Sequence, residues 1–386
     1  MKVYSAKLDE KSQITKIKCS KITFFFYLCT KNMRLHVFNP EHDLALAAHL
    51  SNFTAPHAGR HLRADLGFLP ALWASEDDAI LVDNVEQARK AYGRFRARVG
   101  GGQKQFVDKY QLRQLPITEV KPWGWDLALR SFLLRYGVKS VPSEEEIETI
   151  RDLSHRKYAV ELLSTLGHRE GLTVDVEDRV PVVCQSLDEV KAFLAQHHRI
   201  VVKAPWSSSG RGVRFIDDEL NDYQERWIQN VIGKQGSAVA EPYYNKVKDF
   251  GMEFGSDGNG NILYLGLSLF HTKNGAYIGN VIASEEAKRE QLSRYVSTEL
   301  IDAVKEEIQA LLGNMYKGRY QGPLGIDMMI VARTDGLGFL LHPCVEINLR
   351  QTMGHVALSI PPFADGFPRV MQIALTDKYR IQIRKQ

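Results

Sequence analysis

Short apolar segments alternate with longer amphipathic ones from residue 33 to residue 142, and this alternation restricts the possible folds most strongly. The apolar segments have the length of strands, whereas the amphipathic ones have helical spacing. Strands that alternate with helices favour a parallel sheet covered by helices. We therefore predict an α/β domain here. Its expected strands are Leu35–Phe38 and Ala79–Val82, and its expected helices are Glu41–Leu50, Glu86–Arg98 and Asp126–Tyr136.

Beyond residue 142 the pattern changes to one with turns directly between strands. Ser143 and Glu146 have the spacing of a capping box and predict a helix start. The turn Asp257–Gly260 predicts a tight hairpin, and Glu285–Leu312 predicts a long helix with a break near Ser297. The expected strands are Arg179–Cys184, Arg199–Lys203, Ser237–Glu241, Phe250–Phe254, Asn261–Leu269, Gly325–Val331 and Gly338–Ile347.

The size and composition of the chain limit its class. Its 386 residues are too many for one ordinary domain, and 44% hydrophobic with 25% charged residues is typical of a soluble globular protein. Four cysteines exclude a disulfide scaffold. The net charge of +4 suggests an anionic partner, but residues 1–32 alone hold seven lysines, no arginine and two acidic residues. The rest of the chain is therefore nearly neutral, and we expect no nucleic-acid partner.

The first 32 residues are expected to lie outside the fold. The apolar run Ile22–Cys29 has eight residues, far fewer than the roughly 20 of a membrane helix. The long basic start and the polar residues after the run argue against a signal peptide. We predict a disordered or non-native N-terminal extension over 1–32, with Met33 as an alternative start, in a cytoplasmic protein without a membrane partner.

The strongest chemical pattern lies in the last predicted strand pair. Glu346 and Asn348 are two residues apart on one strand and therefore share a face, which Arg350 extends. Asp327 lies on the neighbouring strand and can reach the same patch. Two carboxylates and an amide oxygen form a ligand set suited to Mg²⁺, and an adjacent arginine can hold a phosphate. The alternative is a solvated edge face.

A second pattern joins a strand to a small polar loop. The strand that ends at Lys203 is followed by Ser207–Gly212, a serine- and glycine-rich loop that leads into another strand. Such a loop lets backbone N–H groups approach an anion. It is not a Walker loop, because no Gly-Lys-Ser/Thr follows. Without the lysine, a simple hairpin turn would be the preferred interpretation.

A third pattern is the segment Ala238–Tyr244 (AVAEPYY), with Asp249 shortly after it. A strand that ends in Glu-Pro is typical of a hinge between lobes. An extended hinge can offer backbone groups to the edge of an adenine, and a nearby carboxylate can bind a ribose. These three patterns together suggest a nucleotide site.

In this order and spacing, the patterns resemble the ATP-grasp superfamily, which includes the D-alanine–D-alanine ligase, glutathione synthetase and biotin carboxylase families. The resemblance covers roughly residues 140–360 and rests on Lys157, Lys203, SSSGRGV, AEPYY, GIDMM and EINLR. It implies α/β and α+β parts: an N-terminal Rossmann-like pre-ATP-grasp domain (33–142) and a two-lobed ATP-grasp fold. The implied lobes are 143–240 and 241–386, with the metal site in the second.

The resemblance also implies residue roles. Lys157 and Lys203 would contact phosphate oxygens, and the serine–glycine loop would close over the β- and γ-phosphates. Asp249 would bind the ribose, although it lies one residue beyond the commonest spacing. The implied nucleotide-binding set is Lys157, Lys203, Ser207, Ser208, Ser209, Gly210, Gly212, Glu241, Pro242, Tyr244 and Asp249. The implied metal ligands are Asp327, Glu346 and Asn348, and the implied catalytic cations are Arg350, Lys203 and Arg211.

The implied activity is that of a ligase that uses ATP and Mg²⁺, or Mn²⁺ in its place. Such enzymes join a carboxylate to an amine or thiol through an acyl-phosphate. The partners would be small molecules, and a homo-oligomer is compatible with this activity. Two alternatives keep the fold: a kinase that phosphorylates a small molecule, and a non-catalytic ATP-binding protein.

The substrate side is less constrained. Asn39, His42 and Asp43 follow the first predicted strand, where open α/β sheets bind ligands, so they are candidate substrate contacts. A capping cluster at a helix start is an equal alternative. His271 and Asn280 are further candidates, with a surface loop as their alternative.

Two smaller patterns are expected to be structural. His57 and His61 have helical spacing for a metal pair but no evident third ligand. Cys184 and Cys344 fall on predicted strands, where we expect small buried hydrophobic side chains.

Overall fold

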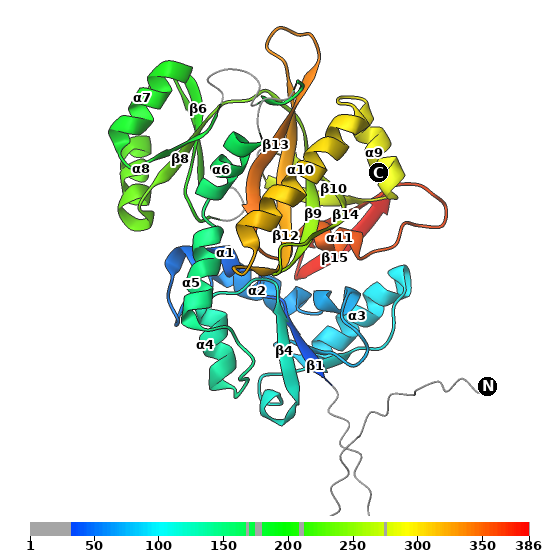
Figure 1. Cartoon of the computed structure of the whole chain (residues 1–386). Coiled ribbons are helices and arrows are strands. Elements are labelled where there is room, and N and C mark those ends of the chain that lie inside the picture. Colours follow the sequence, from blue (N-terminus) through cyan, green and yellow to red (C-terminus); the bar gives the residue numbers. More distant parts are fainter. Residues whose placement is uncertain (1–31, 167–169, 174–179, 208–211, 274–275, 386) are drawn as a thin grey trace, which may run out of the picture.

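The computed structural model describes residues 32–166, 170–173, 180–207, 212–273 and 276–385. Within them the chain forms three sheets, each with its own helices (Figure 1). The α/β and α+β class expected from the sequence is confirmed. The predicted boundaries at residues 142 and 240 stay predictions, and the expected extension lies outside the described residues except for residue 32.

The first sheet is parallel and has the strand order β3-β2-β1-β4. The predicted alternation of strands and helices is therefore confirmed. The sheet lies in the blue to cyan part of Figure 1, below the other two. Its strands are β1 (Met33–Val37), β2 (Ala79–Leu81), β3 (Gln105–Val107) and β4 (Ile117–Pro122). Its helices are α1 (His42–Ala48), α2 (His57–Leu66), α3 (Val85–Val99) and α4 (Leu127–Arg135), with 3-10 turns at Leu69–Leu72 and Leu112–Gln114.

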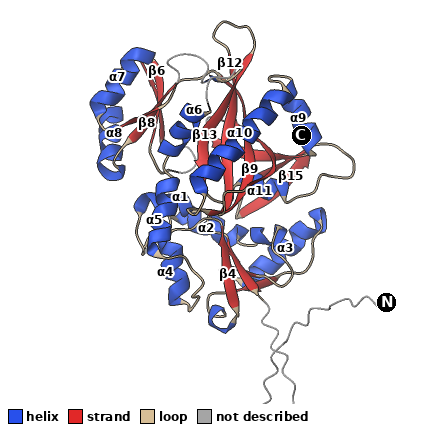
Figure 2. Cartoon of the chain, in the orientation of Figure 1, coloured by secondary structure: helices blue, strands red, loops and turns tan. Residues whose placement is uncertain are grey.

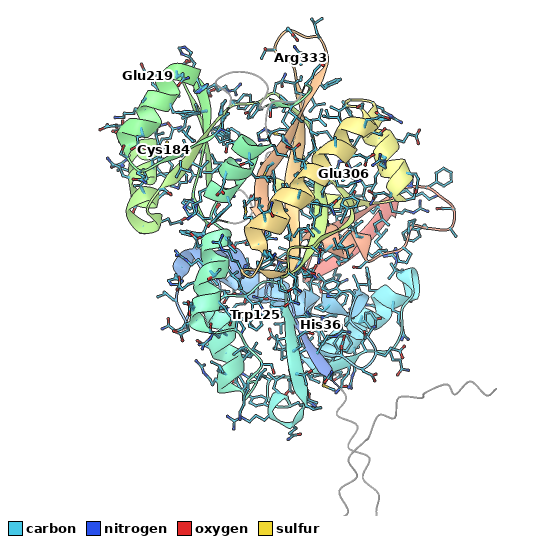
Figure 3. The ribbon with its side chains drawn as sticks, in the orientation of Figure 1. His36, Trp125, Cys184, Glu219, Glu306 and Arg333 are labelled. Atoms are coloured by element: carbon cyan, nitrogen blue, oxygen red, sulfur yellow. The ribbon has the colours of Figure 1, made fainter. Side chains whose placement is uncertain are left out.

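The second sheet is small, antiparallel and ordered β5-β8-β6-β7. Two helices cover one side of it, as Figure 2 shows at the upper left. Cys184 lies buried in this layer, as expected for a small hydrophobic side chain (Figure 3). The strands are β5 (Val182–Cys184), β6 (Arg199–Lys203), β7 (Val213–Asp217) and β8 (Ala238–Pro242), and the helices are α7 (Leu187–His197) and α8 (Asp222–Gln235).

The third sheet has seven antiparallel strands in the order β13-β12-β9-β10-β11-β14-β15. Its inner face and helices α6, α9 and α10 enclose the largest hydrophobic cluster, which includes Phe250, Phe254 and Tyr316. Its strands are β9 (Lys246–Asp257), β10 (Ile262–Lys273), β11 (Ala276–Ile282), β12 (Gln321–Ala332), β13 (Phe339–Asn348), β14 (Arg369–Leu375) and β15 (Tyr379–Lys385). The helices of this region are α5 (Glu144–Leu153), α6 (Lys157–Thr165), α9 (Glu285–Ser293), α10 (Thr298–Tyr316) and α11 (Met353–Leu358).

Local signals in the sequence explain several of these boundaries. The Ser143 hydroxyl accepts a hydrogen bond from the Glu146 N–H, and the Glu146 carboxylate accepts one from the Ser143 N–H. This capping box starts α5 as predicted. Ser297 caps the start of α10 and so accounts for the predicted break in the long helix. Such caps satisfy N–H groups that have no partner within the helix.

Two features hold the parallel-sheet domain against the rest of the molecule. Trp125 packs against the clusters of both parts, and it lies at their junction in Figure 3. The C-terminal strand β15 packs against α2, and a second hydrophobic cluster joins residues of both parts. Of the described helices, none combines the length and apolar character that a membrane crossing requires.

Candidate functional site

The predicted metal ligands lie together on β12 and β13. Asp327 is directly opposite Glu346 in the antiparallel register, and Asn348 is opposite Gly325. The Asn348 amide Nδ2 donates a hydrogen bond of 3.2 Å to Asp327 Oδ2. The side-chain period of two along each strand therefore brings all three polar groups to one face, opposite the hydrophobic core.

Asp327 has an unusual protonation equilibrium. Burial raises its pKa to about 7, with further repulsion from Glu346 and Glu253, while Arg350 and the Asn348 hydrogen bond oppose the shift. Two carboxylates that face each other favour a cation between them, and the donor set fits Mg²⁺ chemically. In the part of the chain that the structure describes, no group of three or more His, Cys, Asp or Glu side chains forms a metal cluster. The set thus depends on the Asn348 amide oxygen.

Arg156 belongs to this site although the sequence analysis did not single it out. It is buried, and its Nη2 donates to Glu346 Oε1 at 2.7 Å. Its Nη1 donates to the Ala204 carbonyl at 2.7 Å and to the Ser207 hydroxyl at 3.1 Å. Its Nε is buried and has no hydrogen-bond partner among the described residues. A buried guanidinium with a free donor beside a serine loop is suited to an anionic ligand.

The side chain of Lys157, one of the two lysines expected to contact phosphate, points away from Arg156 and the predicted metal ligands. Its Nζ donates to Asp152 Oδ1 at 2.5 Å and lies over the Tyr158 ring. Its side chain is 41% exposed. The side chains of neighbouring residues at a helix start point about 100° apart, so only one of Arg156 and Lys157 can face Glu346. The structure does not bring Lys157 together with the other predicted residues.

Lys203 and Glu241 form a buried ion pair between neighbouring strands. Lys203 Nζ lies 2.6 Å from Glu241 Oε1, and each side chain is 8% exposed. The register pairs Glu241 with Val201, so Lys203 lies two residues further along the same face. The ammonium also donates to the Val345 carbonyl at 3.4 Å. Lys203 thereby connects the small sheet to β13, the strand that carries Glu346 and Asn348.

The hinge leads into a small apolar cluster. Tyr244 packs with Met329, Val331 and Val345, and its ring lies 4.8 Å from that of His342. Pro242 ends β8 immediately before this cluster. Tyr244, Met329 and Val331 are buried, so the cluster is packed apolar side chains directly after the end of β8.

Asp249 lies next to this apolar cluster. It is opposite Met329 in the register between β9 and β12. Its Oδ2 accepts hydrogen bonds from the Thr272 hydroxyl at 2.6 Å and from Lys246 Nζ at 2.7 Å. The carboxylate is thus placed near the predicted base site, although its described contacts are within the protein.

Only the ends of the predicted phosphate loop are described. Ser208, Ser209, Gly210 and Arg211 lie outside the described residues. Gly212 is required where it stands, because an added Cβ would lie 2.3 Å from the Cβ of Ser207. The two described ends of the loop, Ser207 and Gly212, are therefore in close contact, and they lie beside Arg156.

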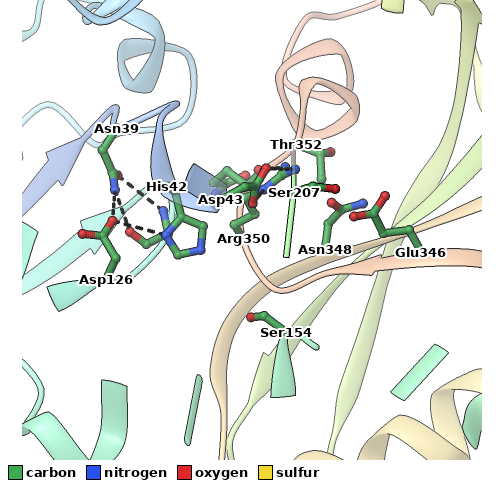
Figure 4. Close-up of polar contacts among 12 residues, drawn as sticks. Asn39, His42, Asp43, Asp126, Ser154, Ser207, Glu346, Asn348, Arg350 and Thr352 are labelled. Carbon is green, nitrogen blue, oxygen red and sulfur yellow. Dashed lines mark hydrogen bonds and ion pairs between the residues drawn. The ribbon is translucent and has the colours of Figure 1, made fainter. Parts of the chain in front are cut away.

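Arg350 meets Asp43 of the parallel-sheet domain across 307 positions of sequence (Figure 4). Its Nε and Nη2 donate to the two carboxylate oxygens at 2.7 and 2.8 Å. Although burial acts against ionisation, Arg350 keeps the pKa of Asp43 below its usual value. One predicted catalytic cation and one predicted substrate contact are thus partners in the same ion pair.

Asn39 and His42 tie the loop after β1 to the loop after β4. Asn39 Nδ2 donates to the Gly124 carbonyl at 2.8 Å and to Asp126 Oδ2 at 3.1 Å. His42 Nδ1 lies 3.4 Å from the same Asp126 oxygen (Figure 4). The capping alternative holds in part: no side chain caps α1, whose N-cap is Glu41, but Asp43 lies in its first turn, where a carboxylate complements the helix dipole.

Asn280 and His271 lie on strands rather than in a surface loop. Asn280 is buried, donates to the Ser268 hydroxyl at 2.9 Å and accepts from the Tyr277 hydroxyl. It faces the same side of the sheet as Asp327, because Ser268 and Asp327 both lie opposite Gly251. His271 is one residue beyond Phe270, the partner of Asn280, and so faces the other side.

Glu253 is a second residue that the sequence analysis missed. Its side chain is buried on the same face of the sheet as Asp327, and its Oε2 lies 3.0 Å from His355 Nδ1. Gly325 and Gly354 leave room for it, since an added Cβ would lie 2.4 or 1.8 Å from a carboxylate oxygen. An acidic residue at an alternate position of a strand with an apolar inner face was the available signal.

We expect Asp43→Asn to lower the free energy of unfolding by about 2 kcal/mol, because it removes one side of a largely buried two-bond ion pair. Chemical denaturation measures the change. Asp377→Asn is the control, since its partner Arg380 is more than half exposed and such pairs contribute at most about 1 kcal/mol. Equal effects of the two substitutions would contradict the importance of the Asp43–Arg350 pair.

No family model and no curated protein matches this chain, but solved structures do. The N5-carboxyaminoimidazole synthetase of Staphylococcus aureus, in complex with ADP, is similar over 89% of this chain and 82% of its own, with 13% identity and a TM-score of 0.47. The biotin carboxylase of Campylobacter jejuni is similar over 89% and 75%, with 13% identity and a TM-score of 0.48.

A third structure is an Archaeoglobus fulgidus protein assigned to the ATP-grasp superfamily. It is similar over 92% of this chain and 100% of its own, with 12% identity and a TM-score of 0.43. At these levels of identity the similarity concerns the arrangement of the chain and extends to no substrate.

Proposed function

We propose that the protein is an ATP-grasp ligase that uses ATP and Mg²⁺ to join a small carboxylate to an amine or thiol through an acyl-phosphate. One observation carries this proposal: Asp327 and Glu346 face each other on paired strands, and Arg156, the residue immediately before α6, donates a hydrogen bond to Glu346. Paired carboxylates with adjacent cations are the arrangement that phosphoryl transfer requires.

The nucleotide would lie between the small sheet and the large one. The apolar cluster of Tyr244, Met329 and Val345 would take the adenine, with the hinge backbone along its edge. Asp249 would bind the ribose, for which it would exchange its present contacts with Thr272 and Lys246. The crevice lined by Arg156, Lys203 and Glu241 has a volume of about 10 Å³, and the one lined by Glu346 and Asn348 about 20 Å³. Both are too narrow for a nucleotide, so we expect the sheets to move apart when ATP binds.

The phosphates would meet Arg156 and Lys203. Arg156 would exchange its contact with Ser207 for a phosphate oxygen, and its free Nε provides another donor. Lys203 would contribute a positive charge held in place by Glu241. The described ends of the serine–glycine loop lie at the same point, and its central residues, including Arg211, would complete the binding of the phosphates.

Asp327, Glu346 and Asn348 would hold Mg²⁺, for which Asn348 would turn its amide oxygen toward the ion. When bound, the ion would neutralise charge on the phosphates and on the facing carboxylates. Arg350 would stabilise the transferred phosphoryl group, and its pairing with Asp43 holds the guanidinium in one orientation. Asn280, on the same face, would help to position the carboxylate substrate.

In the proposed reaction, a substrate carboxylate oxygen attacks the γ-phosphorus, the bond to the β-phosphate oxygen breaks, and ADP leaves. The amine nitrogen or thiol sulfur then attacks the acyl carbon, loses its proton, and phosphate departs with the original carboxylate oxygen. The residues named above act mainly through positioning and charge, which dominate such reactions.

We expect ADP release from the purified protein in a screen of carboxylates crossed with amino acids, amines and thiols. Activity should require Mg²⁺ or Mn²⁺ and should be lost with EDTA. Mass spectrometry of the products then separates the alternatives: a joined product indicates a ligase, and a stable phosphorylated product without an acceptor indicates a kinase. Metal-dependent ATP binding without ADP release from any substrate would contradict both enzymes.

A further inference from the structure

A cavity of about 510 Å³ lies in the parallel-sheet domain, away from the metal ligands. It opens where β1, β2 and β3 end, so its wall includes Val37, Leu81 and Asp108. Loops at the carboxyl ends of parallel strands are common ligand sites, and this volume suits a small molecule.

The cavity has one buried polar group without a partner. Glu41 lines the cavity and is 9% exposed. Arg63 binds its Oε1, whereas its Oε2 is buried and has no hydrogen-bond partner among the described residues. Burial raises the pKa of Glu41, and Arg63 acts against this rise. A buried carboxylate oxygen of this kind is short of one donor, which a ligand can supply.

The other residues that line the cavity indicate what a ligand would carry besides a hydrogen-bond donor for Glu41. Phe38, Phe53, Phe132 and Leu129 provide an apolar lining of ring size. Four carboxylates line the cavity, at residues 41, 83, 108 and 126, against three basic side chains, at residues 60, 63 and 109. Because carboxylates outnumber basic side chains, the lining favours a ligand whose hydrogen-bond donor is cationic over one whose donor is neutral or anionic.

The cavity and the cleft lie on different sides of one short segment. Asn39 and Glu41 line the cavity, whereas His42 and Asp43 line the crevice beside the metal ligands. Asp126 connects the two, because it contacts both Asn39 and His42. A ligand in the cavity would therefore occupy a site separate from the nucleotide.

We propose that this cavity binds a small molecule with a protonated amine on an apolar, ring-sized body, and that Glu41 receives the amine. Apolar burial and the ion pair each contribute to binding. The proposal concerns a site outside the nucleotide cleft and does not depend on the ligase activity.

Titration calorimetry of the full-length protein with phenethylamine, tryptamine and cyclohexylmethylamine tests the proposal. We expect at least one amine to bind with a Kd below about 1 mM. The matched anion 3-phenylpropionate should bind at least tenfold more weakly. Glu41→Gln should weaken amine binding at least tenfold, whereas Glu76→Gln, at an exposed position outside the cavity, should leave the affinity unchanged.

Two further variants keep the test decisive. Ala128→Phe fills the cavity from α4 without removing a charge and should abolish amine binding with little change in melting temperature. Lys203→Ala, in the cleft, should retain amine binding, so a failure of the proposed ligase activity remains distinguishable. Equal affinity for 3-phenylpropionate, unchanged binding in Glu41→Gln and Ala128→Phe, or no binding of any of the three amines would overturn the proposal.

Discussion

Replacing Lys203 with alanine is expected to reduce ATP-dependent turnover by about three orders of magnitude or more. Lys203 is the buried cation between the small sheet and β13, with Nζ 2.6 Å from Glu241 Oε1. Its removal takes a fixed positive charge away from the proposed phosphate site, where fixed charges contribute most to catalysis. ADP release under saturating ATP and Mg²⁺ measures this effect.

The same substitution should also lower the free energy of unfolding by about 3 kcal/mol, because Glu241 is left buried without its partner. The double variant Lys203→Met/Glu241→Gln removes both charges and should regain most of this stability but none of the activity. Lys191→Ala, which breaks an exposed pair with Glu225, should change neither quantity appreciably. Near-normal turnover in Lys203→Ala would contradict the assignment of the site.

Asp327→Asn is expected to make the protein more stable at pH 8 without metal and to lower turnover about a hundredfold or more. The folded pKa of about 7 exceeds the ordinary value of about 3.9, so folding favours the protonated carboxyl. The stabilisation from this group is complete below about pH 4 and is lost as the pH rises through 7. We expect the variant to gain about 2 kcal/mol at pH 8, about half of the full linkage value, since the side chain is partly exposed.

Denaturation curves at pH 5 and pH 8, with and without Mg²⁺, test this prediction. The difference between variant and wild type should be large at pH 8 and small at pH 5. Mg²⁺ should stabilise the wild type by mass action and the variant much less. Asp335→Asn, in the exposed turn between β12 and β13, is the control. A variant that is less stable than the wild type at pH 8 without metal would refute the proposed charge repulsion.

The shared face of Asp327, Glu346 and Asn348 and the place of Lys203 at a strand end could be predicted because they depend on local rules. Strand residues alternate between two faces, and the turn between β12 and β13 brings those strands into contact. The opposition of Asp327 and Glu346 is therefore encoded within about 20 residues of sequence. The capping box at Ser143 and the hairpin at Asp257–Gly260 are similarly local.

The directions of the Arg156 and Lys157 side chains could not be predicted from local sequence rules. A helix start places two neighbouring side chains about 100° apart, and which of them faces the cleft depends on how α6 packs against β13. The family resemblance implied the lysine, whereas packing turned the arginine toward Glu346 and Ser207. Local spacing also did not show that Glu253 packs against Gly325 and Gly354, because both glycines are far from it in sequence.

The sequence by itself determined the alternation of strands and helices and the shared face of Asp327, Glu346 and Asn348. These features follow from side-chain periodicity and turn chemistry over short distances. Only the tertiary structure decided that Arg350 pairs with Asp43, that β15 packs against α2 and that Glu41 lines a separate cavity. Such contacts join segments hundreds of residues apart, and they depend on the packing of whole layers, which no local pattern specifies.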